Sequence, residues 1–200
     1  MANRSTACGL RVRLTALAAA AIELVTIPAV AAAAPPPAGE LAPNFALTTQ
    51  QNERVWLAQL RGRAVVLAFG CTRCGTCPGL MATLADIARG LGDAPGRQVF
   101  FAMVTVDPAH DTPTALREFG RANGLRASAW LLLTEDRPGE VDAVTHRYRV
   151  EVRRAGERVE TDCVVTVIDE QGAIRGRYGP GASGRLAADL RALLGLPASP

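Results

Sequence analysis

The chain has 200 residues, of which 48% are hydrophobic, so it is long enough for one domain with a sizeable core and short appendages. Its formal net charge is only +3 and no basic patch stands out, which excludes nucleic acid as an expected partner.

The first 34 residues predict a targeting segment. Arginines precede an Ala/Leu/Val-rich stretch over residues 14–30, and Ala29-Val30-Ala31 offers an A-x-A cleavage site. The alternative is an uncleaved membrane anchor, although Glu23 and Pro28 interrupt the apolar run that a spanning helix needs. We therefore expect a signal peptide that exports the protein to the periplasm or cell envelope.

The sequence thus predicts that the chain has three parts. Residues 1–34 are the signal peptide or anchor, residues 35–40 are a Pro-rich spacer, and residues 41–196 form the domain. The protein contacts a membrane only if the first segment stays uncleaved. Export leaves an even number of cysteines in a compartment where disulfides persist, namely Cys71, Cys74, Cys77 and Cys163.

The domain opens with two short segments that predict a β-hairpin, residues 42–48 and 54–57. The apolar run Ala64–Phe69 predicts a central strand that is covered on both faces. The amphipathic run Leu80–Leu91 predicts the first long helix.

The rest of the chain alternates between strands and helices. Predicted strands cover 98–106, 130–133, 164–168 and 173–178; predicted helices cover 113–123, 138–146 and 185–194; residues 147–160 predict an exposed hairpin or insertion. This order predicts an α/β fold with a mixed sheet flanked by helices and an N-terminal β-hairpin. A C-x-x-C sequence after the first central strand makes the pattern thioredoxin-like.

Three cysteines, Cys71, Cys74 and Cys77, follow the Ala64–Phe69 strand at three-residue spacing. We expect Cys74 to enter the following helix and Cys77 to lie in its first turn. Unpaired N–H groups and the helix dipole would then lower the pKa of the Cys74 thiol, and Arg73 adds positive charge beside it. Such a thiolate is both a nucleophile and a metal ligand. The alternative is that Cys74 and Cys77 form a purely structural disulfide.

Three segments carry a resemblance to a known family: Val66–Cys74, the D-P-x-x-D-T-P sequence within Val104–Pro113, and Thr166–Gly172. Over residues 41–194 the chain resembles the Sco/SenC proteins, which are thioredoxin-fold proteins of the cell envelope. The resemblance implies a role in assembling the copper centre of cytochrome c oxidase. It also implies copper as the metal. The partners that it implies are protein thiol or disulfide clients and the copper subunit of the oxidase.

The chain departs from this family at the site itself. Sco proteins space their two cysteines C-x-x-x-C, one residue longer than Cys74 to Cys77, and their copper histidine position falls on Thr161. Cys163 lies two residues further and would share the strand face of Thr161 if that segment were extended. We therefore expect any copper to bind as Cu(I) to sulfur, through Cys74, Cys77 and Cys163, with Cys71 as a further candidate.

Other chemistry-bearing residues have simpler interpretations. Cys71 is either a small buried hydrophobe or a third thiol for metal binding or disulfide exchange. His110 is expected in a solvated loop and His146 on a helix surface. Thr112 or Asp111 is expected to cap the next helix, with Pro113 at its first position. Asp107 and Asp111 are both expected near this cap, where they would also shape the loop beside the cysteines.

Two classes of function follow from these observations. As a thiol–disulfide oxidoreductase, Cys74 would attack and Cys77 would resolve the mixed disulfide. As a metallochaperone, both residues would be Cu(I) ligands and nothing would be turned over. The short cysteine spacing favours the first class, either for copper handling or as a general envelope oxidoreductase, whereas the D-P-x-x-D-T-P segment favours the second.

Overall fold

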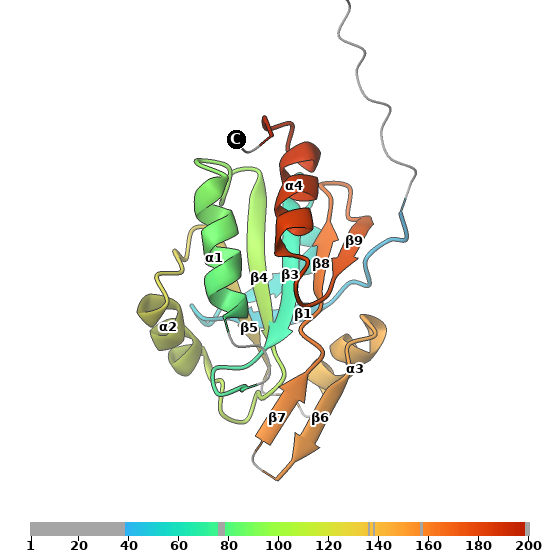
Figure 1. Cartoon of the computed structure of the whole chain (residues 1–200). Helices are drawn as coiled ribbons and strands as arrows, with labels where there is room; N and C mark the ends of the chain where they lie inside the picture. Colours follow the sequence, from blue (N-terminus) through green and yellow to red (C-terminus); the bar gives the residue numbers. More distant parts are fainter. Residues whose placement is uncertain (1–38, 76–78, 136, 138, 157, 199–200) are drawn as a thin grey trace, which may run out of the picture. The chain divides into compact units, whose positions relative to one another are not determined.

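The computed structural model of the protein describes residues 39–75, 79–135, 137, 139–156 and 158–198 (Figure 1). Among these residues, the strands are β1 (Ala46–Thr49), β2 (Arg54–Trp56), β3 (Ala64–Gly70), β4 (Val99–Thr105), β5 (Trp130–Thr134), β6 (Val152–Ala155), β7 (Arg158–Thr161), β8 (Val165–Ile168) and β9 (Ile174–Tyr178). The helices are α1 (Leu80–Gly90), α2 (Pro113–Ala122), α3 (Glu140–Arg147) and α4 (Ser183–Leu193), with a 3-10 turn at Leu57–Leu60.

Seven strands form one mixed sheet in the order β2-β1-β5-β4-β3-β8-β9. Strands β3, β4 and β5 are parallel, whereas β8 runs antiparallel to β3 and β9 runs antiparallel to β8. The predicted thioredoxin-like α/β fold is therefore confirmed. The sequence did not indicate that the N-terminal hairpin joins this sheet, which it does by pairing β1 with β5.

The central strand β3 is buried along its whole length because it faces two cores. Val66 and Ala68 pack into a cluster that α1, α2 and α4 cover, and Figure 1 shows α1 and α4 in front of the sheet. Val65, Leu67 and Phe69 pack on the other face, where residues of α3 and the segment before β3 cover them. The alternation of side chains along a strand thus explains the continuous apolar run.

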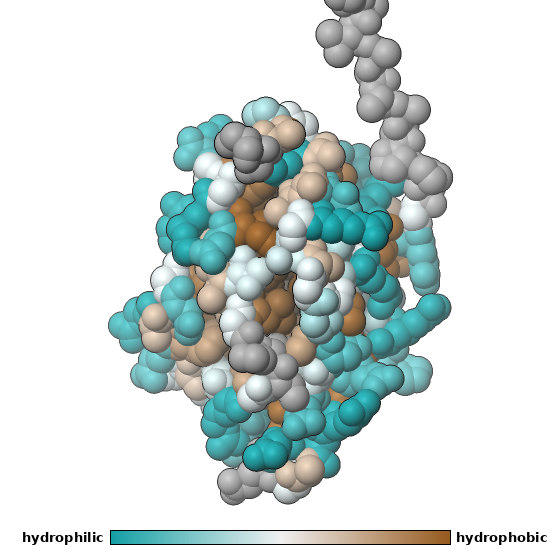
Figure 2. Space-filling model, in the orientation of Figure 1, coloured by the Kyte–Doolittle hydropathy of each residue, from teal (hydrophilic) through white to brown (hydrophobic). Residues whose placement is uncertain are grey.

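A shallow apolar area remains on the helical face of the sheet. Figure 2 shows hydrophobic surface between α1 and α4. A pocket of about 600 Å³ lies there, and it is lined by side chains such as Ile87, Leu91 and Leu196. Among the described residues, no helix combines the length and the apolarity that crossing a membrane requires.

Helix α2 begins at Pro113, as the sequence predicts, and its side-chain cap is Thr112 and not Asp107 or Asp111. Thr112 has extended backbone angles and its hydroxyl accepts a hydrogen bond from the N–H of Ala115, at 3.3 Å, while Pro113 occupies the first helical position. A side-chain cap followed by proline is a common helix start, because proline lacks an N–H that would be unpaired there. This helix start fixes the end of the D-P-x-x-D-T-P loop.

Helix α1 covers the predicted amphipathic run, but Cys74 does not lie at its start. The helix begins at Leu80, and Gly79 stands before it with a left-handed φ of 77°. Cys74 therefore lies in the loop and does not enter the helix, so the expected dipole effect on its thiol is wrong. Glycine adopts positive φ at little cost, which lets the chain turn abruptly into α1 at this residue.

The charged stretch before β8 forms a hairpin, as expected. Strands β6 and β7 pair antiparallel and make a separate two-stranded sheet. Arg154 of β6 donates to the backbone carbonyl of Val106, at 3.1 Å, and to Asp142 of α3, at 2.8 Å. These bonds hold the hairpin against the end of β4, beside the loop that carries the family signature.

Candidate functional site

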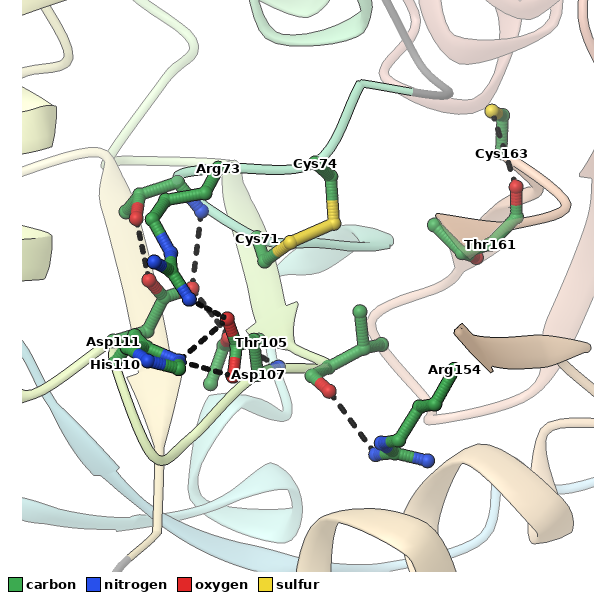
Figure 3. The surroundings of a disulfide bond; sticks show 12 residues. Cys71, Arg73, Cys74, Thr105, Asp107, His110, Asp111, Arg154, Thr161 and Cys163 are labelled. Carbon is green, nitrogen blue, oxygen red and sulfur yellow. Dashed lines mark hydrogen bonds and ion pairs between the residues drawn. A yellow bond between two sulfur atoms is a disulfide. The ribbon is translucent and has the colours of Figure 1, made fainter. Parts of the chain in front are cut away.

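The cysteines lie where β3 ends. Cys71 follows the last residue of this strand and forms a disulfide with Cys74, with 5.0 Å between the Cα atoms (Figure 3). The backbone N–H of Cys74 also donates to the carbonyl of Cys71, at 3.3 Å, so the four residues form a compact turn. Cys71 is 9% exposed and packs in the core cluster on the α3 face, whereas Cys74 is partly buried at its edge.

This pairing changes the expected partner of Cys74. The expected partner of Cys74 was Cys77, but the sulfur of Cys74 is bonded to Cys71. Cys71-Thr72-Arg73-Cys74 is itself a C-x-x-C sequence, so the spacing allows this pair as well as the expected one. Cys77 lies outside the described residues, so its predicted role stays a prediction.

Asp111 anchors the cysteine loop to the sheet. Its carboxylate is fully buried and accepts hydrogen bonds from the backbone N–H of Thr72, at 3.0 Å, and from the Thr72 hydroxyl, at 2.5 Å. The hydroxyl of Thr105, at the end of β4, donates to the same carboxylate. A buried carboxylate is tolerated when donors satisfy it in this way. The prediction that Asp111 shapes the loop is confirmed, while Thr72 carried no sequence signal for this role.

Asp107 forms an ion pair with Arg73, the second residue between the bonded cysteines. Its carboxylate lies 3.3 Å from the guanidinium of Arg73 and 2.9 Å from Nδ1 of His110. The N–H of Asp107 donates to the Thr105 hydroxyl at 3.0 Å, which fixes the start of the loop. Arg73 and His110 are about half exposed, at 47% and 48% of their side chains, so His110 lies in a solvated loop as predicted.

Cys163 occupies the segment between β7 and β8. Its φ of 57° is left-handed, so the chain is not extended there, and the expectation that Cys163 shares a strand face with Thr161 is wrong. The antiparallel pairing of β3 with β8 ends at Ala68 and Val165, so Cys163 lies two residues before the paired part of β8.

The sulfur of Cys163 is also in a disulfide. This sulfur lies 3.6 Å from the carbonyl oxygen of Thr161, a contact that is drawn as a dashed line in Figure 3. Thr161 ends β7 and is buried, at 8% exposure. The sequence proposed Cys163 as a thiolate ligand, but its sulfur can take that role only after reduction.

Two tyrosines flank these segments. Tyr148 packs on Phe69 with ring centroids 5.6 Å apart, and its hydroxyl donates to the carbonyl of Pro43 at 2.8 Å. Burial raises the pKa of Tyr148 well above its ordinary value. Burial, together with the hydrogen bond to Asp189, raises the pKa of Tyr178 to about 12. Both phenols therefore stay protonated at neutral pH and act here as hydrogen-bond donors.

The donor chemistry of the site depends on its redox state. Within the part of the chain that the structure describes, no group of three or more His, Cys, Asp or Glu residues is arranged to hold a metal ion. The sulfurs of Cys71, Cys74 and Cys163 are in disulfides, and the thiolate is the form of cysteine that binds metal. His146 is exposed on α3, as expected. The arrangement is therefore suited to disulfide exchange first and to metal binding only once it is reduced.

The fold and the cysteine loop together define a thioredoxin-like protein with a disulfide at the end of a central parallel strand. Comparisons with known proteins agree. The model of the SCO1/SenC family matches residues 33–195. The chain therefore belongs to the SCO1/SenC family.

Individual relatives are more distant. The "Putative copper-binding protein" of Stutzerimonas stutzeri is 33% identical over 81 residues, which span 38% of this chain and 38% of that protein. The structure of Bradyrhizobium japonicum ScoI with copper bound is 23% identical, with a TM-score of 0.65, over 76% of this chain and 99% of that chain. BsSco, for which a disulfide switch is reported and which is called a member of the Sco family of cytochrome c oxidase assembly proteins, is 21% identical, with a TM-score of 0.66, over 78% and 94% of the two chains. At these identities the two structures show that the fold is shared.

Proposed function

We propose that this protein carries out thiol–disulfide chemistry in copper handling for cytochrome c oxidase assembly, with Cys74 as its central residue. The observation that carries the proposal is the Cys71–Cys74 disulfide at the end of β3, next to the D-P-x-x-D-T-P loop. Family membership supports the link to copper, as does the copper-binding relative. The exported segment predicted from residues 1–34 would place the protein in the periplasm or cell envelope.

The chemistry follows from the burial of the two sulfurs. Cys74 lies at the edge of the core and Cys71 lies within it, so an incoming client thiolate would reach Cys74 first. Attack on Cys74 breaks the Cys71–Cys74 bond, releases the Cys71 thiolate and forms a mixed disulfide with the client. A second client thiol then attacks the client sulfur, so the client leaves as a disulfide and the protein is left with two thiols.

Reduction also creates ligands for copper. Thiolates suit Cu(I), a soft ion, so reduced Cys74 would bind it together with Cys77 and Cys163, and Cys71 is a further candidate. Copper is here a cargo that the protein receives and passes on to a client such as the copper subunit of the oxidase. Exchange with a client disulfide would re-form the Cys71–Cys74 bond, leave the client as two thiols and remove the Cys74 ligand, which would couple the redox state of the loop to copper release.

The test is a Cu(I) titration of the oxidised and reduced protein against a competing Cu(I) chelator. Disulfide mapping of the protein as isolated identifies the partner of Cys163, and thiol counting after mild reduction gives the number of thiols available. We expect no binding by the oxidised protein, one Cu(I) per chain after reduction, and loss of binding in Cys74→Ser. The Cu(I) affinity of Cys163→Ala measures how much Cys163 contributes to binding.

A second function remains a candidate because the family's copper histidine position is Thr161 in this chain. A hydroxyl is a poor ligand for Cu(I). If the reduced wild type binds no Cu(I) but exchanges disulfides with model thiols, the protein is a general envelope thiol–disulfide oxidoreductase. If it binds Cu(I) but exchanges no disulfides, it is a metallochaperone without turnover. Either result contradicts the coupled function proposed above.

A further inference from the structure

The disulfide ring at the end of β3 is tied to the sheet through both of the residues that it encloses. Only Thr72 and Arg73 lie between the bonded cysteines. Thr72 donates two hydrogen bonds to Asp111, and Arg73 pairs with Asp107 (Figure 3). The ring is therefore not a free surface loop.

The two ties differ in strength. Arg73 is about half exposed and its contact with Asp107 is 3.3 Å long, so water and salt weaken it. Asp111 is fully buried, and its bonds to Thr72 measure 3.0 Å and 2.5 Å. Hydrogen bonds to a buried charged group are among the stronger ones in proteins. The tie through Asp111 is thus the one that fixes the ring.

Asp111 is itself fixed to the sheet. It accepts a bond from the hydroxyl of Thr105, the last residue of β4, and its N–H donates to the carbonyl of Asp107 at 2.9 Å. Val106, the residue that follows β4, donates its N–H to the carbonyl of Gly70 at 2.8 Å. The loop after β4 and the loop after β3 therefore form one connected network around the ring.

We propose that Thr72 and Asp111 are positioning residues for the Cys71–Cys74 disulfide and that their hydrogen bonds make it harder to reduce. After reduction, the two thiols could move apart in a loop without these hydrogen bonds, whereas the hydrogen bonds to Asp111 keep them close. Keeping two groups close raises their effective concentration and so favours the bond between them. This inference rests on the function proposed above, because it concerns the same disulfide.

The experiment measures the equilibrium of this disulfide with glutathione. One glutathione thiolate attacks a sulfur of the ring and displaces the other as a thiolate, which takes up a proton. A second glutathione then attacks the glutathione sulfur of the mixed disulfide, giving oxidised glutathione and two protein thiols. Rapid alkylation followed by mass spectrometry of the peptide carrying Cys71 and Cys74 gives the ratio of the two forms.

We expect Thr72→Val and Asp111→Asn to shift this equilibrium about tenfold toward the dithiol, which is about 30 mV for a two-electron couple. Thr72→Ser keeps the hydroxyl and should keep the wild-type equilibrium. Thr112→Ala is the matched control, because it lies in the same loop and removes the cap of α2 without touching the ring. It should lower the melting temperature and leave the equilibrium unchanged.

Wild-type equilibrium constants in both Thr72→Val and Asp111→Asn would overturn the proposal. A shift in Thr112→Ala as large as that in Thr72→Val would also overturn it, because general destabilisation would then explain the effect. If Asp111→Asn does not fold, the comparison of Thr72→Val with Thr72→Ser decides. The measurement needs no copper, so a failed Cu(I) titration would remove the proposed copper function and leave this result intact.

Discussion

Two segments flank the end of β3, and they differ in how much of the family pattern they keep. The D-P-x-x-D-T-P loop after β4 keeps the signature, and its two aspartates hold the residues between Cys71 and Cys74. In the segment after β7 the sequence predicts a departure from the family, with Thr161 at its histidine position, and the structure gives Cys163 a left-handed backbone. The chain therefore keeps the part of the site that positions the cysteines and changes the part that would add a ligand from another strand.

The largest effect that tests this comparison is expected from Asp111→Ala. The change leaves the N–H and hydroxyl of Thr72 and the hydroxyl of Thr105 without their buried acceptor. We expect a loss of about 3 kcal/mol in the free energy of unfolding, because each unpaired buried donor costs on the order of 1–3 kcal/mol. Urea unfolding of the oxidised protein measures it. A loss below about 1 kcal/mol would show that the loop does not depend on this carboxylate.

The comparison predicts a gain of function on the other side of β3. Thr161→His places an imidazole at the family's histidine position. We expect the reduced protein to bind Cu(I) about tenfold more tightly, which corresponds to about 1.4 kcal/mol. Competition with a Cu(I) chelator measures the change. Thr161→Val is the matched control, because it keeps the volume of threonine at this buried position and adds no ligand. Equal affinities in the histidine and valine variants would mean that the segment after β7 does not reach the metal.

The smallest effect concerns Tyr178 of β9. It pairs with Val165 of β8, and Val165 lies two residues after Cys163. The folded protein holds the phenol proton more tightly than the unfolded chain, where the pKa is near 10, because burial and Asp189 raise the pKa to about 12. The contribution of Tyr178 to the free energy of unfolding is therefore fully present below pH 10 and is lost as the pH rises through 12. Tyr178→Phe should cost about 1 kcal/mol at pH 7, through the lost hydrogen bond, and should make this fall shallower.

Urea unfolding at several values between pH 8 and pH 12 tests the Tyr178 prediction. Tyr148 also has a raised pKa and contributes a fall in the same direction, so some loss of stability remains in the variant. An identical pH dependence in wild type and Tyr178→Phe would contradict the prediction.

The sequence indicated the sheet well because its signals are local. The apolar run Ala64–Phe69 became β3, and Thr112 with Pro113 started α2 as its capping pattern predicted. The pairing of β1 with β5 was not predicted, because strand order in a sheet is set by packing between segments far apart in the chain. Local patterns carry little information about such neighbours.

The site was harder to predict than the fold. Three cysteines at equal spacing allow Cys74 to pair in either direction, and spacing alone does not choose between Cys71 and Cys77. Cys74 was expected at the entrance of α1, whereas Gly79 is the residue that precedes the first helical residue. The left-handed backbone at Cys163 had no signal either, since glycine and asparagine are the residues that usually mark that conformation.

The smallness of the disulfide ring has a consequence for the unfolded chain. The bonded cysteines are three positions apart, so the bond closes a ring of only four residues. In the chain-entropy model, a ring of this size lowers the entropy of the unfolded chain and so stabilises the folded state by about 2 kcal/mol. A 15-residue loop would stabilise it by about 3 kcal/mol. A typical domain is stable by roughly 5–15 kcal/mol. We therefore expect the sheet and both cores to stay intact when this bond is reduced and formed again.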